Sequence, residues 1–347
     1  MNTNHLIAAQ TYKRENNFGL LRLILAFMVV SFHINMLYGV NPGRLISYLV
    51  GFAVSSFFVI SGLLVTWSFD KDQELIAYSI KRFFRIYPLY FIMILIQMCA
   101  LLALFPGVFN MKLAIYSLKY FVYNAIFLNF LQPTIPGVFE NLKYNAINGS
   151  LWTIKIEVLF YVLLPLIYYA FKKFRIKFLI LIYFLSALFF IVSTMNPAWN
   201  TFVDQFPAYL RFFIVGIILY LYGYKIRFSS FYALLISVIL FFTSYYAIGN
   251  VFYKAFVYPV CLGIIVYLVG FSKPVFDLKY DISYGVYIIH FPVIQIFLFF
   301  GYFTSSFYLF IPVVLTVIIL MASLSYILVE KRFIELGHRL PKKLIGL

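Results

Sequence analysis

Charged residues are scarce in this sequence, and their scarcity excludes a water-soluble fold. Only 11% of the 347 residues are Asp, Glu, Lys or Arg, whereas 64% are hydrophobic and 22% aromatic; soluble domains carry about 25% charged residues. Because a membrane-spanning helix needs roughly 20 apolar residues, the chain has room for about ten spans. We therefore expect an all-α, polytopic membrane protein whose single transmembrane domain covers residues 1–347, without an appended soluble domain.

Cysteine and acidic residues are also few. The two cysteines, Cys99 and Cys261, lie in apolar runs without CxxC or Cys/His spacing, so we expect neither a metal site nor a disulfide framework. The 11 acidic residues face 27 basic ones, which gives a net charge of +16. Since the basic residues form short clusters between apolar runs, they indicate membrane topology and not nucleic-acid binding.

Ten apolar runs are long enough to cross a bilayer. They cover residues 18–38, 49–69, 86–105, 152–170, 178–195, 207–224, 231–247, 251–270, 283–301 and 306–329. The first run follows a polar start, so we expect no cleavable signal peptide. An eleventh run, residues 113–131, contains Lys119 and several Asn and Tyr residues and is ambiguous.

The basic residues decide how the ambiguous run is interpreted. If residues 113–131 crossed the membrane, the next span would carry Lys172, Lys173, Arg175 and Lys177 outside, against the preference of Lys and Arg for cytoplasmic loops. We therefore predict a re-entrant or interfacial helix within an external segment, residues 106–151, and cytoplasmic N- and C-termini. The basic residues that remain outside are Arg44, Lys112, Lys119, Lys143, Lys155, Arg211 and Lys254.

Arg22 and His33 are ionisable residues inside the first span, where charge is costly. They are eleven residues apart, which places them on one helix face about 16 Å apart along the axis. Glu157 lies five residues into a span that enters from outside, at a depth similar to that of His33. A histidine and a carboxylate at matched depth are typical of acid/base catalysis. Alternatively, Arg22 is a topology anchor, His33 a packing histidine and Glu157 a structural partner of Arg211 or Lys155.

Three further features allow a functional and a structural interpretation. In KRFFRIYP, Arg82 and Arg85 are neighbours on a helix face and suited to sharing a phosphate, or they are cytoplasmic anchors. In FFVISG, the small residues Ser61 and Gly62 allow close approach by a ligand or by another helix. His290 and Glu330 are polar points in or beside late spans, with the same ambiguity.

Six ordered segments resemble the acyltransferase-3 family of membrane O-acyltransferases, which modify bacterial surface glycans and other acceptors. LLRLILAFMVVSFH is similar to the family's opening Arg-to-His motif, FFVISGLLV to FFxxSG, and KRFFRIYPLYF to RRxxRxxP. LWTIKIEVLFYVLLP resembles WSLxxExxFYxxxP, SYGVYIIHFPV resembles SYxxYLxHxP, and SLSYILVEKRF resembles the closing motif. The departures are Gly19 where many members have Asp, Thr153 in place of Ser, and Arg332 in place of Pro.

The resemblance implies a function and a set of roles. Members are taken to transfer an acyl group, usually acetyl from cytoplasmic acetyl-CoA, to an acceptor across the membrane, here an envelope glycan such as O-antigen in lipopolysaccharide, in the bacterial inner membrane. His33 and Glu157 would be catalytic, with no metal. The acyl-CoA would contact Arg22, Arg82, Arg85, Ser61 and Gly62. The acceptor or the catalytic residues would contact Trp152, Tyr161, Arg211 and His290.

The competing function is a multi-span transporter or flippase of a glycan precursor, because charges inside spans are also typical of transporters. The absence of a visible internal repeat and the alignment of Arg22 with His33 favour the enzyme. We expect a lipid bilayer, acyl-CoA and a glycan as partners, and no nucleic acid.

Overall fold

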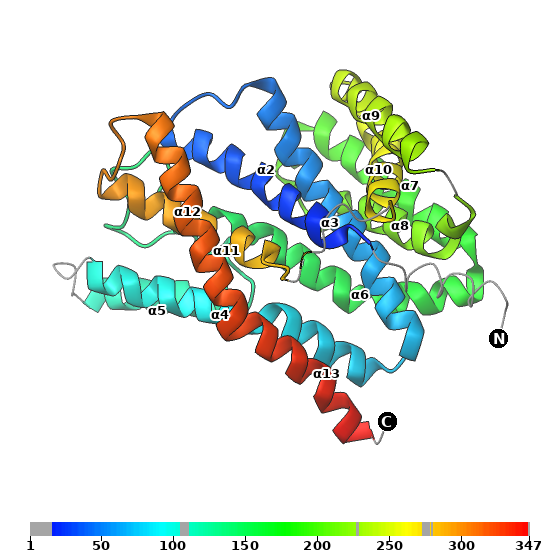
Figure 1. The fold of residues 1–347 in the computed structure, drawn as a ribbon, viewed down its shortest axis with the longest axis horizontal. Coiled ribbons are helices and arrows are strands. Elements are labelled where there is room, and N and C mark those ends of the chain that lie inside the picture. The colour runs from blue at the N-terminus through cyan, green and yellow to red at the C-terminus, as the bar shows by residue number, and fades with distance from the viewer. Residues whose placement is uncertain (1–15, 105–110, 227–228, 273–277, 279, 346–347) are drawn as a thin grey trace. The chain divides into compact units, whose positions relative to one another are not determined.

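A computed structural model describes residues 16–104, 111–226, 229–272, 278 and 280–345, and every regular element among them is helical (Figure 1). The basic residues Lys13, Arg14, Arg227, Lys273 and Lys279, which entered the topology prediction, lie outside this description. The long helices are α2 (Phe18–Tyr38), α3 (Gly43–Asp72), α4 (Leu75–Leu104), α5 (Met111–Ala125), α6 (Trp152–Phe174), α7 (Ile176–Met195), α8 (Phe206–Tyr222), α9 (Ser230–Ala247), α10 (Tyr258–Gly270), α11 (Ser283–Phe299), α12 (Phe307–Ser325) and α13 (Lys331–Ile345). Short turns are η2 (Gly149–Leu151), η3 (Pro197–Phe202), η4 (Gly223–Lys225), η5 (Tyr253–Val257) and η6 (Tyr326–Glu330).

The helices confirm the predicted class, an all-α polytopic membrane protein. Among the described residues, seven helical segments are long and apolar enough to cross a membrane, and α8, α9 and α11 are shorter apolar helices. Together they account for all ten predicted runs. The ambiguous run forms α5, a separate 15-residue helix that is not one of these spans. It is tied to α4 by a hydrogen bond from the Tyr120 hydroxyl to Gln97 Oε1 at 2.8 Å.

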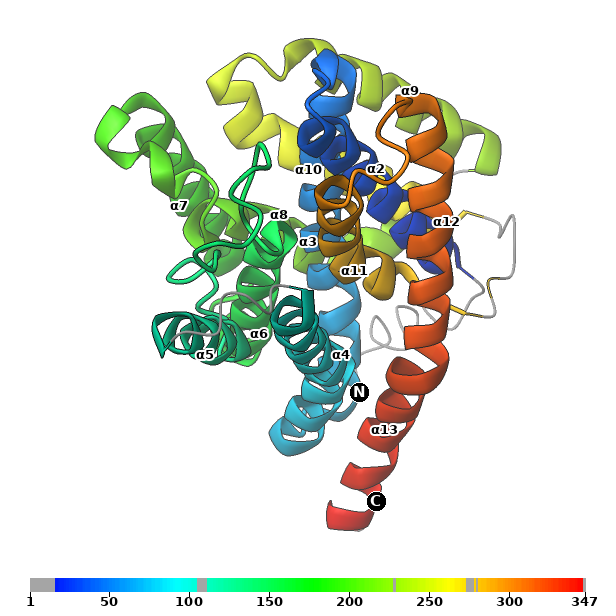
Figure 2. The same ribbon diagram turned by 90° about the vertical axis from the view of Figure 1, so that its left-hand side faces the viewer.

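Some helices extend past the predicted spans because hydrophobicity marks only the part that lies in lipid. α3 begins at Gly43 and α4 at Leu75, so the basic cluster KRFFRIYP forms extra helical turns at the start of α4. At the other end of the chain, α12 continues through the π-helical turn η6 into α13, and Figure 2 shows the three as one continuous rod. α13 is an amphipathic basic helix that the search for apolar runs missed.

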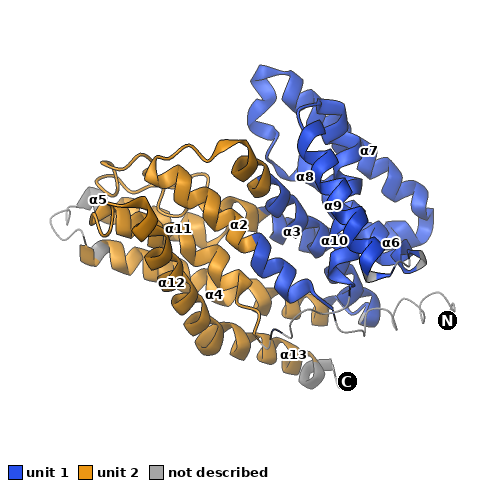
Figure 3. Cartoon of the chain, turned by 45° about the horizontal axis from the view of Figure 1, so that its top comes forward, with its two compact units in different colours: residues 1–25, 51–75, 156–279 blue, residues 26–50, 76–155, 280–347 orange. Residues whose placement is uncertain are grey.

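The chain forms two compact units, which we describe separately (Figure 3). Unit 1 comprises residues 1–25, 51–75 and 156–279, and unit 2 comprises residues 26–50, 76–155 and 280–347. Each unit thus draws on three separate stretches of chain. The predicted single domain is not tested by this division, because both units contain apolar spans.

In unit 1, α3 and α8 cross at two glycines. A Cβ atom on Gly62 would lie 2.1 Å from the Phe213 carbonyl oxygen, and one on Gly216 would lie 2.2 Å from the Val59 carbonyl oxygen. The backbones of the two helices are therefore in direct contact, as in the small-residue crossings of membrane helices. Of the two uses foreseen for Gly62, the structure shows the approach of another helix.

Replacing Gly62 with alanine is expected to destabilise the protein strongly. The added methyl group would collide with backbone atoms, which move less readily than side chains, and overpacking costs roughly 1–3 kcal/mol or more. The Gly51→Ala variant on the same helix is the control, because a Cβ there meets nothing within 4 Å. Thermal unfolding in detergent should show a lower midpoint for Gly62→Ala only; equal midpoints for both variants would contradict the described crossing.

The cytoplasmic ends of three helices of unit 1 meet at Asp70, near the end of α3. Its carboxylate accepts hydrogen bonds from the hydroxyls of Tyr168 on α6 and Tyr220 on α8, the second at 2.5 Å. The predicted topology runs α3, α6 and α8 in the same direction, from outside to inside. Their C-terminal ends should therefore lie on one side, in agreement with this contact.

Candidate active site

His33 on α2 and His290 on α11 form a direct pair within unit 2. The two rings are 5.0 Å apart between centroids, and His33 Nδ1 lies 2.9 Å from His290 Nε2. His290 is completely buried, whereas His33 is partly exposed. The ring of Phe291 packs edge-on against His33 at 5.2 Å. The sequence predicted both histidines as site residues, but not their contact.

The partners of these rings determine which nitrogens carry protons when both histidines are neutral. His290 Nδ1 lies 3.2 Å from the Val286 carbonyl oxygen, which can only accept, so Nδ1–H must be the donor. His290 Nε2 is then an acceptor, and His33 Nδ1–H donates to it. This leaves a lone pair on His33 Nε2. A histidine held in this tautomer is ready to act as a base or a nucleophile.

A proline and an asparagine fix the position of His290. Pro292 has no N–H, so the carbonyl of Ile288, four residues earlier on α11, lacks its helical hydrogen bond. Asn148 Nδ2 donates to that carbonyl at 2.9 Å instead, and Asn148 Oδ1 accepts from the Ser150 hydroxyl at 2.7 Å. The turn before α6 is thereby attached to α11 two residues from His290.

The substituted motif residue Thr153 adds a second connection between these elements. Its hydroxyl lies 2.7 Å from the Tyr287 hydroxyl, and the Tyr287 ring contacts His290 at 6.0 Å between centroids. The hydroxyl that Thr shares with the family's Ser is therefore used in holding α6 to α11.

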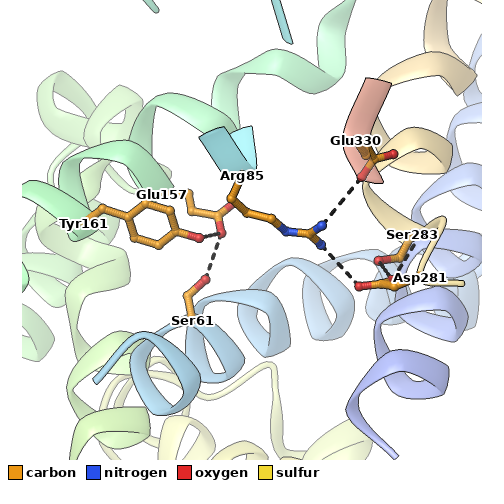
Figure 4. A network of polar contacts seen from close by, with 7 residues as sticks. All are labelled: Ser61, Arg85, Glu157, Tyr161, Asp281, Ser283 and Glu330. Carbon is orange, nitrogen blue, oxygen red and sulfur yellow. Dashed lines mark hydrogen bonds and ion pairs between the residues drawn. The ribbon is translucent and has the colours of Figure 1, made fainter. Parts of the chain in front are cut away.

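Glu157 on α6 belongs to unit 1, where two hydroxyl groups hold it (Figure 4). Ser61 on α3 donates to Glu157 Oε1 at 2.9 Å, and Tyr161, one turn along α6, donates to the same oxygen at 2.5 Å. Among the described residues, no hydrogen bond reaches Oε2. The carboxylate is thus fixed through one oxygen while the other is available.

The structural alternatives for Glu157 find no support among the described contacts. Lys155 lies over the ring of Phe130, with Nζ 4.6 Å from its centroid, and Arg211 stacks on Phe190 at 4.1 Å. Neither cation forms an ion pair with Glu157 in the part of the chain that the structure describes. Because His33 and Glu157 belong to different units, their predicted pairing stays a prediction.

The predicted phosphate ligand Arg85 carries two ion pairs within unit 2 (Figure 4). Its Nη2 lies 3.2 Å from Asp281 Oδ2, and its Nη1 lies 3.7 Å from Glu330 Oε2. Asp281 in turn accepts a hydrogen bond from Ser283 at 2.6 Å. The charge of Arg85 is therefore already offset, so phosphate binding by Arg85 would require one of these pairs to open.

The remaining predicted site residues lie on helices as expected, without a contact that tests their roles. Arg22 is half-buried on α2, Arg82 is half-buried one turn before Arg85, and Trp152 is half-buried at the start of α6. Asn148 and Asp281 were missed by the sequence analysis. Asn148 lies outside the apolar runs, and the only sequence signal for it is the proline in a distant helix whose carbonyl it serves.

Comparisons with known proteins agree with this arrangement of motifs. The model of the acyltransferase-3 family, described as an acyltransferase domain, matches residues 15–330. An O-acetyl transferase of Shigella phage Sf6 is 26% identical over 336 residues, covering 92% of this chain and 96% of the relative. Nodulation protein 10 of Rhizobium leguminosarum bv. viciae is 32% identical over 174 residues, 46% of either chain. No solved structure matches the chain. Since the family model spans the six motifs and most of the sequence, this protein belongs to the acyltransferase-3 family.

Proposed function

We propose that this protein transfers an acetyl group from cytoplasmic acetyl-CoA to a hydroxyl group of an envelope glycan, such as O-antigen, at the bacterial inner membrane. Membership of an acyltransferase family supports acyl transfer, and the phage relative named O-acetyl transferase supports a hydroxyl acceptor. The observation that carries the proposal is the histidine pair, because its hydrogen bonds leave a lone pair on His33 Nε2.

In the proposed reaction, His33 Nε2 takes the proton of the acceptor hydroxyl as its oxygen attacks the thioester carbonyl. The carbon–sulfur bond then breaks, and the proton on His33 passes to the CoA sulfur, which leaves as a thiol. The products are an O-acetyl ester and CoA. His290 remains hydrogen-bonded to His33 Nδ1–H and stabilises the charged imidazolium as it forms. If His33 instead takes the acetyl group itself, the same lone pair is the nucleophile.

Glu157 and the cytoplasmic cations complete the proposal. Glu157, held through Oε1, contributes a negative charge that would favour a positively charged transition state. Arg22 and Arg82, predicted on the cytoplasmic side, are suited to the phosphates of CoA, because guanidinium groups bind phosphate through paired hydrogen bonds.

The purified protein is expected to bind acetyl-CoA and to release CoA slowly, which a thiol-reactive dye detects. Adding a lysate fraction that contains the acceptor glycan should increase the rate of release. Mass spectrometry of the envelope glycan from cells with and without the gene should show one acetyl group per modified sugar only when the gene is present. A transporter would neither release CoA nor change the glycan mass, so a negative result in both measurements would refute the proposal.

A further inference from the structure

Two cations of unit 1 share one aromatic ring near the turns that the topology prediction places outside. The guanidinium carbon of Arg211 on α8 lies 4.1 Å from the centroid of Phe190 on α7, and Lys254 Nζ in η5 lies 5.4 Å from the same centroid. The two side chains are close enough to interact electrostatically. Neither contributes to the histidine pair or to the Glu157 cluster.

Arg211 is unusually buried for a charged residue, with an exposed fraction of 2%. Its guanidinium donates to the Ala208 carbonyl and stacks on Phe190 and Phe212, but its Nε–H is buried without a hydrogen-bond partner. Buried charges in proteins are ordinarily paired with an opposite charge. One carbonyl and two rings compensate a guanidinium only in part, and the nearby Lys254 adds a second positive charge.

The nearest acidic residue does not supply the missing charge. Asp204 is exposed, and its Oδ1 accepts a hydrogen bond from the Tyr209 hydroxyl at 3.0 Å. Among the described residues, no carboxylate lies within ion-pair distance of Arg211 or Lys254. The pair of cations is therefore arranged for an anion that the chain itself does not provide.

The surroundings of the cations are rigid. The buried Ser186 hydroxyl accepts from the Arg211 backbone N–H at 2.9 Å and donates to the Pro207 carbonyl at 2.5 Å, so it is inserted into the first helical hydrogen bond of α8. Lys254 lies in a π-helical turn, a form that occurs often at functional sites. Both cations are thus held by irregular helical turns that pack against α7.

The neighbouring surface indicates that the anion belongs to a lipid. Exposed apolar side chains lie close in sequence to these residues, namely Leu188 and Val192 on α7 and Phe252 and Val257 around η5. In a membrane protein such side chains face lipid. Arg and Lys together match a phosphate group, and phosphate is the anion that lipids present at the level of helix ends.

We propose that Arg211 and Lys254 bind the phosphate group of a lipid at the external ends of α7, α8 and α10. This site goes beyond acyl transfer and is tested by binding alone. The phosphate comes either from a membrane phospholipid or from a lipid-linked acceptor, and the two sources differ in whether the phosphate bears a second small ester group.

The binding test uses dodecyl phosphate with the full-length protein in an uncharged detergent. Native mass spectrometry should show retained ligand, and the Lys254→Met variant should bind at least 10-fold more weakly because it loses one of two cations at similar side-chain length. Lys173→Met is the matched control: this exposed lysine lies 5.3 Å from the ring centroid of Phe174, near the cytoplasmic end of α6. The control variant should bind like the wild type.

Two results would overturn the proposal: equal binding by the wild type and Lys254→Met, or an equal loss in Lys173→Met, which would indicate attraction by net charge. Lys254→Met carries the test even if an Arg211→Met variant fails to fold, and its unfolding midpoint without ligand verifies its folding. Competition with phosphatidylglycerol then separates the sources. Displacement of dodecyl phosphate indicates a phospholipid site, and retention indicates the terminal phosphate of a lipid-linked acceptor.

Discussion

Replacing His33 with alanine is expected to lower acyl transfer by roughly 10²- to 10⁴-fold, the range for loss of a general base, and to leave the protein folded. His33 provides the lone pair on Nε2, and no other side chain among the described residues shares its hydrogen bond with His290. Because His33 is only partly buried, its removal should disturb packing less than the loss of a core residue. The measurement is the rate of CoA release by the purified protein, with glycan acetylation in cells as a second readout.

The control for this variant is His338→Ala, which changes an exposed histidine on α13. It should retain wild-type activity. Near-normal activity of His33→Ala, with a normal unfolding midpoint, would exclude His33 as base or nucleophile. Loss of the folded protein in His33→Ala would instead assign the histidine a packing role, which was the alternative raised by the sequence.

The role of His290 is separable from that of His33 by pH dependence. A general base must be unprotonated, so wild-type activity should rise with pH through the titration of His33. In a His290→Gln variant, the midpoint of this rise should move, because the partner of His33 Nδ1–H has changed. A purely structural role would lower the amount of active protein without moving the midpoint.

Replacing Glu157 with glutamine is expected to reduce acyl transfer by about 10²-fold. Glutamine keeps an oxygen at the position of Oε1, so the hydrogen bonds from Ser61 and Tyr161 can still form. The variant therefore removes the negative charge and little else. Its unfolding midpoint should stay close to that of the wild type while the rate of CoA release falls.

Two variants separate the charge from the hydrogen bonds. Tyr161→Phe removes one donor to Oε1 and should lower the rate by less than Glu157→Gln, because the carboxylate remains. Glu335→Gln removes an exposed carboxylate on α13, which forms a 3.6 Å ion pair with Arg339, and should have no effect on the rate. Full activity in Glu157→Gln would mean that Glu157 is a structural acceptor for the two hydroxyls.

The topology could be predicted from the sequence because it depends on local quantities. An apolar run long enough to cross the bilayer forms a helix wherever it occurs in the chain, since lipid offers no partner for an unpaired backbone group. Clusters such as Lys172 and Lys173 fix the direction of each span through their own preference for the cytoplasm. These rules also identified α5, Met111–Ala125, as a helix outside the set of spans. They gave helix ends only where apolar character ended, so they missed the cytoplasmic start of α4 and all of α13.

The partners of the polar side chains were decided by tertiary structure. From its sequence, Arg85 is a cation at the cytoplasmic end of a span, and only the packing of α4 beside α11 and α12 brings it to Asp281 and Glu330. His33 and His290 are 257 residues apart, and no periodicity within either helix relates them. Spacing along a helix determines which face a side chain occupies, but which face meets which depends on the shapes of all the helices at once. The sequence therefore determined the spans and the candidate residues, and the fold determined which of those residues act on one another.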